Sequence, residues 1–284
     1  MTVQSDAPRA GLGITAREVA IRLHAAHAEG VLLDAESMDT LPASPEVQGL
    51  NVRPGTAAWN MDAAYAVQDE LTALRVAEGR RVCGYKLGYT SAAMRNQMGV
   101  TSPNYGPLYD DMLLGDGSST DGFVQPRVEP EVTVVLSRDL EGADLQLYEI
   151  AASVGEVRAS LEIVDSIWND YRFTAELNTA DGSSAAGVVL GPNLGVTPLD
   201  SHRPSVVVSV EGGVVATASG AAASGHPLLS LRWLCTVLAA RGLPGLKAGQ
   251  TIMTGGLTAA IPLVLGSRVT ADFSTGASVS VARP

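Results

Sequence analysis

The sequence contains too few cysteines to form a disulfide framework or a thiolate zinc site. Only Cys83 and Cys235 occur in 284 residues, far apart and without a C-x-x-C spacing. His24, His27 and His226 also lack metal-ligand spacing with another histidine or with a cysteine. Such sparse cysteine use is typical of a reducing compartment, so we expect a cytoplasmic protein.

Basic clusters, long apolar runs and phosphate-binding loops are missing as well. The formal net charge is −11, and no segment gathers lysine and arginine, which argues against binding to nucleic acid or to an anionic membrane. No apolar run reaches the roughly 18 residues that a spanning helix needs, and the amino terminus does not resemble a signal peptide. Glycine-rich pieces such as residues 254–256 lack the spacing of a nucleotide-binding loop.

The first 80 residues are predicted to be mainly helical. Thr15 followed by Glu18 has the spacing of a capping box, and the helix that it starts is expected to run to about Glu29 and to end at Gly30. Apolar residues at helical spacing predict a second helix over Asn60–Glu78. Residues 1–13 are polar and are expected to fray, and the proline-containing residues 39–56 are expected to form a loop.

From Val82 onward, short β-like runs alternate with turn residues, and 46% hydrophobic residues supply a large core. Ser205–Val210 and Val214–Ala218 predict a hairpin, and Pro227–Arg241 predicts a late helix. The other predicted strands are Val82–Leu87, Val128–Leu136, Ser160–Val164, Gly187–Leu190, Gln250–Met253, Arg268–Phe273 and Ser278–Ala282. The fold class is therefore α+β, with a helical segment at residues 1–80 leading into a β-rich catalytic core at residues 81–284 as one integrated unit.

Two glutamates stand at the head of the most apolar predicted strand. Glu129 and Glu131 are two residues apart, so their side chains share one face of the strand and repel one another unless a cation lies between them. Glu162 or Asp165, in the apolar run of residues 160–166, can complete a set of oxygen ligands for a hard divalent ion. The alternative is that Glu129 and Glu131 lie on the solvated face of an edge strand, where Pro130 is tolerated.

A lysine and an aspartate add polar groups to this apolar background. Lys86 lies in an otherwise uncharged strand flanked by glycines. Close to a divalent ion its pKa is expected to fall, so that it can move a proton or bind a substrate carboxylate. The alternative for Lys86 is an ordinary surface lysine. The alternative for Asp110-Asp111 is a turn without a role in the chemistry.

Several motifs occur in the order found in one enzyme group. They are Gly84-Tyr85-Lys86-Leu87-Gly88-Tyr89-Thr90-Ser91, Tyr105-Gly106-Pro107-Leu108, Pro126-Arg127-Val128-Glu129-Pro130-Glu131, Leu161-Glu162-Ile163-Val164-Asp165-Ser166 and Gly225-His226-Pro227-Leu228. From about Ala16 to Val281 the chain resembles the 2-keto-4-pentenoate hydratase and 4-oxalocrotonate decarboxylase branch of the fumarylacetoacetate hydrolase superfamily. The resemblance implies a mixed β-roll core with an N-terminal helical segment.

The resemblance also implies an active site and its cofactor. The metal ligands for Mg²⁺ or Mn²⁺ would be Glu129, Glu131 and Glu162, and the catalytic residues would be Lys86 and Asp110, with Asp165 supporting the ligands. The implied substrate-binding residues are Gly88, Ser184, Thr254 and Gly255. The resemblance implies a small-molecule 2-oxo acid substrate, a homo-oligomer, and association with a homologous hydratase.

Within this branch, decarboxylation is favoured. The Thr254-Gly255-Gly256 segment and Asn169-Asp170-Tyr171-Arg172-Phe173 are closer to the decarboxylases. The implied reaction removes CO₂ from a 2-oxo-3-enedioate through a dienolate that the metal stabilises, and gives a 2-hydroxydienoate. The alternatives are a 2-keto-4-pentenoate hydratase, a biosynthetic relative that acts on another keto acid, and a non-catalytic partner. Two departures bear on the substrate, because Ile167 replaces a family arginine and Gly182 replaces a family asparagine.

Overall fold

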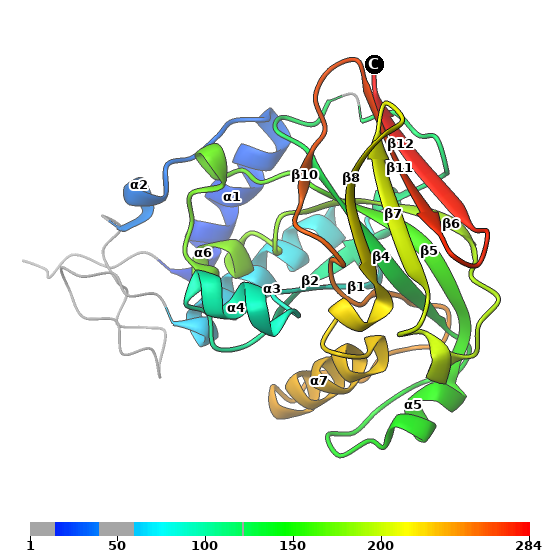
Figure 1. Ribbon diagram of the computed structural model, residues 1–284. Helices are drawn as coiled ribbons and strands as arrows, with labels where there is room; N and C mark the ends of the chain where they lie inside the picture. Colours follow the sequence, from blue (N-terminus) through cyan, green and yellow to red (C-terminus); the bar gives the residue numbers. More distant parts are fainter. Residues whose placement is uncertain (1–14, 40–59, 121) are drawn as a thin grey trace, which may run out of the picture.

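The computed structural model describes residues 15–39, 60–120 and 122–284. The expected frayed start and nearly all of the expected loop at residues 39–56 lie outside these residues. Figure 1 places the N-terminal helices on one side of the molecule and the β-strands on the other. No helix within the described ranges is both long and apolar enough to cross a membrane.

The first helices form where their caps predict them. Helix α1 (Ala16–Glu29) begins with the capping box of Thr15 and Glu18 and ends at Gly30, whose φ of +63° is the left-handed value that glycine adopts readily. Helix α3 (Met61–Ala77) begins at Asn60, whose side chain accepts a hydrogen bond from Ala63 N at 2.8 Å. Apolar residues of α1, α3 and α6 (Ala175–Ala180) form a small second core around Trp168.

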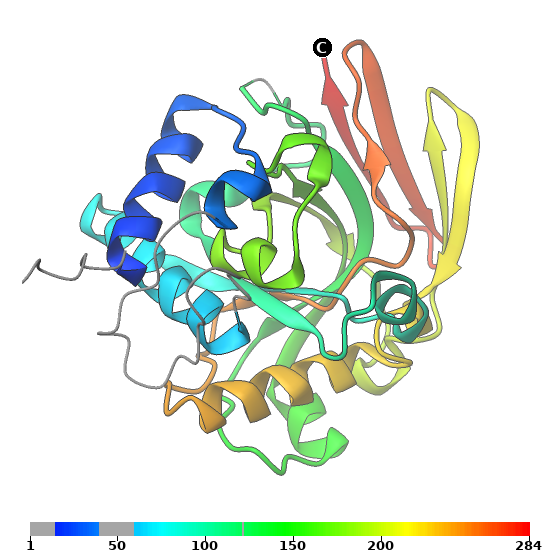
Figure 2. The same cartoon turned by 90° about the vertical axis from the view of Figure 1, so that its left-hand side faces the viewer.

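The main sheet is strongly curved and mixed, as Figure 2 shows. Its strand order is β2-β1-β9-β4-β5-β6-β3, and β10 pairs with the start of β4. The strands are β1 (Val82–Gly88), β2 (Asn104–Tyr109), β3 (Leu113–Leu114), β4 (Arg127–Leu136), β5 (Val154–Val164), β6 (Ala185–Asn193), β9 (Thr251–Met253) and β10 (Ile261–Pro262). The long strands β4 and β5 lie in the middle of this sheet, so residues on one of their faces meet inside the curve.

A second sheet packs against the main one over the large hydrophobic core. Its order is β12-β11-β7-β8, from β7 (Ser205–Val210), β8 (Gly213–Ser219), β11 (Ser267–Phe273) and β12 (Ser278–Arg283). The predicted hairpin is β7 and β8, whose turn at Glu211 and Gly212 has positive φ angles of 47° and 79°. Helix α7 (Pro227–Ala240) buries its leucines in the same core. The α+β fold class with a curled β core and N-terminal helices is confirmed.

Several short elements were not predicted. Strand β2 contains Gly106 and Pro107, which normally count against a strand, but β2 is the edge of the sheet and tolerates a residue without an N–H. Gly106 is needed there because a Cβ would lie 2.0 Å from the carbonyl oxygen of Gly182. The unpredicted elements also include the helices α2 (Ala35–Asp39), α4 (Ala92–Met98), α5 (Leu147–Ser153) and α6, and the two-residue strands β3 and β10.

Candidate metal centre and active site

Three glutamates meet on the concave face of the main sheet. In the antiparallel pairing of β4 with β5, Glu129 lies opposite Glu162, and Glu131 is two residues further along the same face of β4. One carboxylate oxygen from each residue lies within 4.8 Å of the others. Glu131 and Glu162 have exposed fractions of only 0% and 1%. The structure thus brings together Glu129, Glu131 and Glu162, and leaves Asp165 outside the cluster.

The alternative of a solvated edge strand is wrong. Strand β4 pairs with β5 on one side and with β9 and β10 on the other. Pro130 is tolerated because its carbonyl accepts a hydrogen bond from Leu257 N at 2.9 Å, which places its missing N–H on the side of the loop between β9 and β10. No hydrogen bond to β5 is lost, so a proline can stand inside a central strand.

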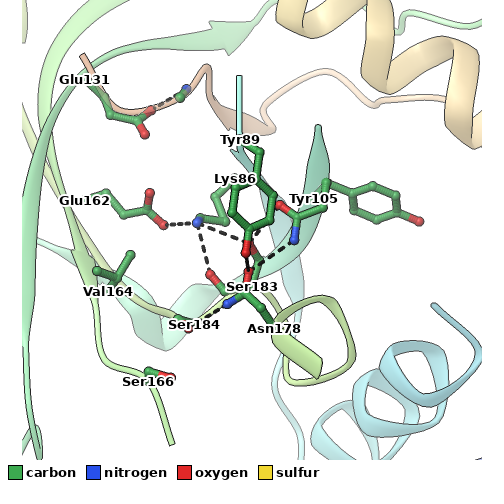
Figure 3. Close-up of polar contacts among 12 residues, drawn as sticks. Lys86, Tyr89, Tyr105, Glu131, Glu162, Val164, Ser166, Asn178, Ser183 and Ser184 are labelled. Carbon is green, nitrogen blue, oxygen red and sulfur yellow. Dashed lines mark hydrogen bonds and ion pairs between the residues drawn. The ribbon is translucent and has the colours of Figure 1, made fainter. Parts of the chain in front are cut away.

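Lys86 extends from β1 to the same cluster, as Figure 3 shows. Its Nζ forms an ion pair with Glu162 Oε1 at 3.0 Å and donates a hydrogen bond to the Ser183 carbonyl at 3.0 Å. The side chain is buried, with only 4% of the residue exposed. The surface-lysine alternative is therefore wrong.

Burial and mutual repulsion change the protonation of the cluster. Burial, reinforced by Glu162, raises the pKa of Glu129 to about 7, and burial together with Glu162 and Glu129 raises the pKa of Glu131 well above its usual range. Burial also raises the pKa of Glu162. For Lys86, burial favours the neutral amine, but the attraction of the carboxylates outweighs it and the pKa is raised. The carboxylates by themselves thus raise the pKa of Lys86, which is opposite to the lowering expected beside a divalent ion.

The cluster fits a hard divalent cation. One ammonium against three carboxylates leaves two formal negative charges in a buried site, which is costly without a counter-ion. Glu131 Oε1 and Glu162 Oε2 are enclosed and accept no hydrogen bond from any described residue. Carboxylate oxygens in this number are the ligands that Mg²⁺ and Mn²⁺ prefer. By charge, burial and donor type together, Glu129, Glu131 and Glu162 are the residues that could hold such an ion.

A strained turn positions Lys86 from the other side. Ser183 and Ser184 have positive φ angles of 61° and 55°, which are uncommon for residues other than glycine. Asp181 holds this turn by accepting a hydrogen bond from Ser184 N at 3.0 Å, and Asn178 Nδ2 donates to Ser184 Oγ at 2.8 Å. The strain therefore directs the Ser183 carbonyl and hydroxyl at Lys86.

A pocket of about 380 Å³ opens over this cluster. Lys86, Glu129, Arg127 and Tyr171 all line it. Arg127 Cζ lies 3.8 Å from the centre of the Tyr171 ring, a cation–π contact. The apolar part of the wall comes from Val164, Phe173, Ala259 and Ala260. The pocket therefore combines two residues of the acidic cluster, a guanidinium and an apolar wall.

The predicted substrate-binding residues have different surroundings. Gly88 and Ser184 line the pocket. Gly255 N donates to Glu131 Oε2 at 2.9 Å and so holds a metal ligand. Thr254 Oγ1 donates to the Val132 carbonyl at 2.6 Å and is fully buried, so its side chain joins β9 to β4 rather than facing the pocket.

Asp110 is not brought into the active site. It follows β2 at the end where Tyr109 pairs with Val82, whereas Lys86 pairs with Gly106. Its carboxylate accepts hydrogen bonds from Arg81 N and Arg81 Nε, both at 2.9 Å. The acidic partner that the structure gives Lys86 is Glu162.

Arg127, Asn178 and Ser183 were not predicted as site residues. Arg127 lies two residues before Glu129 on the same strand face, so the alternation that paired the glutamates could have included it. No comparable signal marks Asn178 or Ser183, because they reach the site through the folding of α6 and the turn after it.

Gly256 is expected to control the position of Glu129. A Cβ at Gly256 would lie 1.9 Å from Glu129 Oε2. We expect G256A to displace this carboxylate and to weaken Mg²⁺ binding about 10- to 100-fold in calorimetric titration, as loss of ligand support typically does. The control is G115A, where the nearest atom to a Cβ is Ser118 Oγ at 4.0 Å. Equal Mg²⁺ affinity of G256A and G115A would contradict this role.

Comparison with known proteins identifies the family of this chain. A 4-oxalocrotonate decarboxylase of Pseudomonas sp. (strain CF600) is 36% identical over 220 residues, which cover 76% of this chain and 83% of that protein. The chain belongs to the 4-oxalocrotonate decarboxylase and 2-keto-4-pentenoate hydratase family. A 2-keto-4-pentenoate hydratase of Paraburkholderia xenovorans (strain LB400) is 38% identical over 202 residues, or 70% of this chain and 74% of that protein. No protein-family model matches the chain.

A solved structure extends the similarity to the whole fold. The 4-oxalocrotonate decarboxylase from Pseudomonas putida G7, complexed with magnesium and adipate, superposes with a TM-score of 0.84 at 30% identity and covers 96% of this chain and 100% of its own. The family resemblance predicted from the motifs is confirmed. Ile167, where the motif resemblance implies an arginine in the family, is 5% exposed and packs in the second core beside Trp168.

Proposed function

We propose that the protein is a metal-dependent lyase that decarboxylates a 2-oxo-3-enedioate of the 4-oxalocrotonate type to a 2-hydroxydienoate. The proposal depends on the convergence of Glu129, Glu131 and Glu162 with Lys86 beside a pocket that Arg127 also lines. Decarboxylases of this name are among its relatives, and the structural neighbour binds magnesium and adipate, a dicarboxylate. The complete acidic cluster argues against a non-catalytic partner.

The charged groups suit the two ends of such a substrate. Mg²⁺ or Mn²⁺, when bound, would supply a Lewis acid and a template for the 1-carboxylate and the 2-oxo oxygen. Arg127 is two residues from Glu129 on β4, which corresponds to about 6.6 Å along a strand, a distance similar to the length of an extended six-carbon diacid. Its guanidinium forms no ion pair with a described residue and can bind the distal carboxylate.

The chain's own residues can carry out the remaining steps. The bond between the distal carboxylate and its neighbouring carbon breaks, CO₂ leaves, and the electron pair moves through the conjugated chain to the 2-oxo oxygen. Lys86 Nζ holds a proton beside the carboxylate cluster and can donate it to that oxygen, which gives the 2-hydroxydienoate. The apolar wall that includes Val164 and Phe173 excludes water and favours the loss of a charged carboxylate as neutral CO₂.

Hydration is the second candidate, because hydratases of the same family are equally similar in sequence. The deciding experiment mixes purified protein, Mg²⁺ and 2-oxo-3-hexenedioate and follows CO₂ release and substrate absorbance with and without a chelator. Chelator-sensitive CO₂ release supports decarboxylation. No CO₂ release, with turnover of 2-hydroxypenta-2,4-dienoate instead, would assign the protein to hydration.

Replacing Arg127 is expected to affect dicarboxylates selectively. We expect R127M to raise KM for 2-oxo-3-hexenedioate about 10- to 100-fold, because a charge-assisted hydrogen bond contributes about 1.5–3 kcal/mol. Mg²⁺ affinity should not change. R172M is the control, since the Arg172 side chain is 85% exposed. An unchanged KM in steady-state kinetics of R127M would remove Arg127 from substrate binding.

Homo-oligomerisation and association with a homologous hydratase stay predictions. Light scattering of the purified protein, alone and mixed with such a hydratase, would test both.

A further inference from the structure

A second cavity, larger than the active-site pocket, lies beneath the N-terminal helices. Its volume is about 720 Å³, and it shares no lining residue with the active-site pocket. The carboxyl-terminal ends of α1 and α3, residues 122–124 and the start of β6 surround it. The reaction proposed above uses none of these residues.

Arg75 brings a buried and unpartnered charge to this cavity. The residue is 4% exposed, and its guanidinium makes neither a hydrogen bond nor an ion pair with any residue of the described ranges. Its Cζ lies 5.1 Å from the centre of the Tyr109 ring, a cation–π contact, and the buried Asp181 attracts it electrostatically without a hydrogen bond or an ion pair to it. A buried guanidinium with no hydrogen-bonded anionic partner is costly, and these contacts are weak compensation.

The other charged groups around the cavity are already satisfied. Arg80 forms an ion pair with Asp111 at 3.2 Å, and His24 Nε2 lies 2.7 Å from Glu78 Oε1. Asp165 accepts hydrogen bonds from Val124 N at 2.8 Å and from Gln125 N at 2.7 Å. The remaining acid, Glu29, is exposed to solvent. Arg75 is therefore the arginine of this lining that forms neither an ion pair nor a hydrogen bond with a described residue.

We propose that this cavity is a binding site for a small oxyanion, with Arg75 as its anchor. A guanidinium presents a planar set of donors that matches a carboxylate or a tetrahedral oxyanion in a bidentate arrangement. Met112, Phe123 and Ile167 give the cavity an apolar side, which suits the hydrocarbon part of an organic carboxylate. The site is separate from the metal centre and does not depend on the proposed reaction.

Thermal unfolding of the full-length, metal-free protein tests this site. Sodium acetate is the probe for an organic carboxylate and sodium sulfate is the probe for a tetrahedral oxyanion, each against sodium chloride at equal ionic strength. The variants are R75M, R75K and R80M, and R80M is the matched control because it removes an arginine of the same cavity that is already paired. R127M removes the guanidinium of the active-site pocket.

We expect acetate or sulfate to raise Tm of the wild type, R80M and R127M in a saturable way beyond chloride. For R75M the half-saturating concentration should rise at least tenfold, and its Tm without added anion should equal or exceed that of the wild type. R75K keeps the positive charge but not the planar set of guanidinium donors. Its half-saturating concentration should therefore lie between that of the wild type and the value expected for R75M, and it can be measured even if R75M fails to fold. Two results overturn the proposal. One is a wild-type Tm that rises with acetate and sulfate no more than with chloride. The other is an R75K half-saturating concentration equal to that of the wild type, when R75M either shows the wild-type value or fails to fold.

Discussion

Replacing Glu131 by glutamine is expected to abolish turnover while leaving the protein folded. Glutamine can still accept the hydrogen bond from Gly255 N, but it removes one of the three charges that bind the metal. Because the metal supplies several kcal/mol of stabilisation to the developing charge, we expect a loss of activity of about 10³-fold or more. The measurements are CO₂ release at saturating Mg²⁺ and calorimetric Mg²⁺ binding, both of which should be lost.

The same variant should weaken the pH dependence of stability. Burial raises the pKa of Glu131 well above that of an unfolded chain, so the folded protein holds a proton that the unfolded chain releases. Metal-free wild type should therefore lose stability as pH rises from about 4.5 through the raised pKa values of Glu131 and Glu129. Glu162 and Lys86 face the same group and remain in E131Q, so the slope should become smaller rather than vanish.

A matched control separates the cluster from general charge effects. Glu156 lies on β5 like Glu162, but its side chain is 45% exposed. E156Q should retain turnover, Mg²⁺ binding and the pH slope of the wild type. If metal-free E131Q at pH 8 is no more stable than metal-free wild type, the buried carboxylates do not destabilise the metal-free fold at that pH.

Much of the fold follows from local patterns. The nine predicted strands all form, because alternating or continuous apolar residues bounded by turns have few other ways to be buried. The caps of α1 and α7 are visible in the sequence as Thr15 and as His226 followed by Pro227. The strand face shared by Glu129 and Glu131 could be derived from periodicity alone, and only the pairing with Glu162 required the register of β4 with β5.

The remaining features depend on tertiary contacts that no local pattern encodes. Gly106 and Pro107 argue against a strand, yet β2 forms because it is an edge and because the 181–184 turn leaves no room for a side chain at Gly106. Asp110 is an acid near an aromatic residue in sequence, but its position at the end of β2 pairs it with Arg81. The alternation along β4 marks Arg127, but its contact with Tyr171 joins it to a distant segment that no local pattern indicates.

The Thr254-Gly255 segment illustrates how a motif can indicate a family without indicating a substrate. Thr254 bonds the backbone of β4, and Gly255 holds Glu131, so both residues support the acidic cluster rather than the wall of the pocket. Selection between the two reactions is better sought in other residues that line the pocket, such as Arg127, Tyr171 and Phe173. This distinction makes the choice of reaction an experimental question about those side chains.

Lys86→Met is expected to separate the chemical step from metal binding. The variant removes the ammonium that lies 3.0 Å from Glu162 Oε1 and leaves three carboxylates without an internal counter-ion. Breaking one side of a buried ion pair costs about 3–5 kcal/mol, so metal-free K86M should be less stable than the wild type. Mg²⁺ should restore that stability and bind at least as tightly as it does to the wild type, because the cluster is then more negative.

Turnover of K86M should nevertheless fall about 10²- to 10⁴-fold, the range expected when a positioned proton donor is lost. Retained or tightened Mg²⁺ affinity with this loss of kcat assigns Lys86 to the reaction, whereas E131Q is expected to lose metal and turnover together. K247M is the control, since Lys247 pairs with Asp139 at 3.0 Å on the surface and its side chain is 53% exposed. If K86M loses Mg²⁺ binding in proportion to kcat, Lys86 supports only the ligand Glu162 and the proton must come from another group.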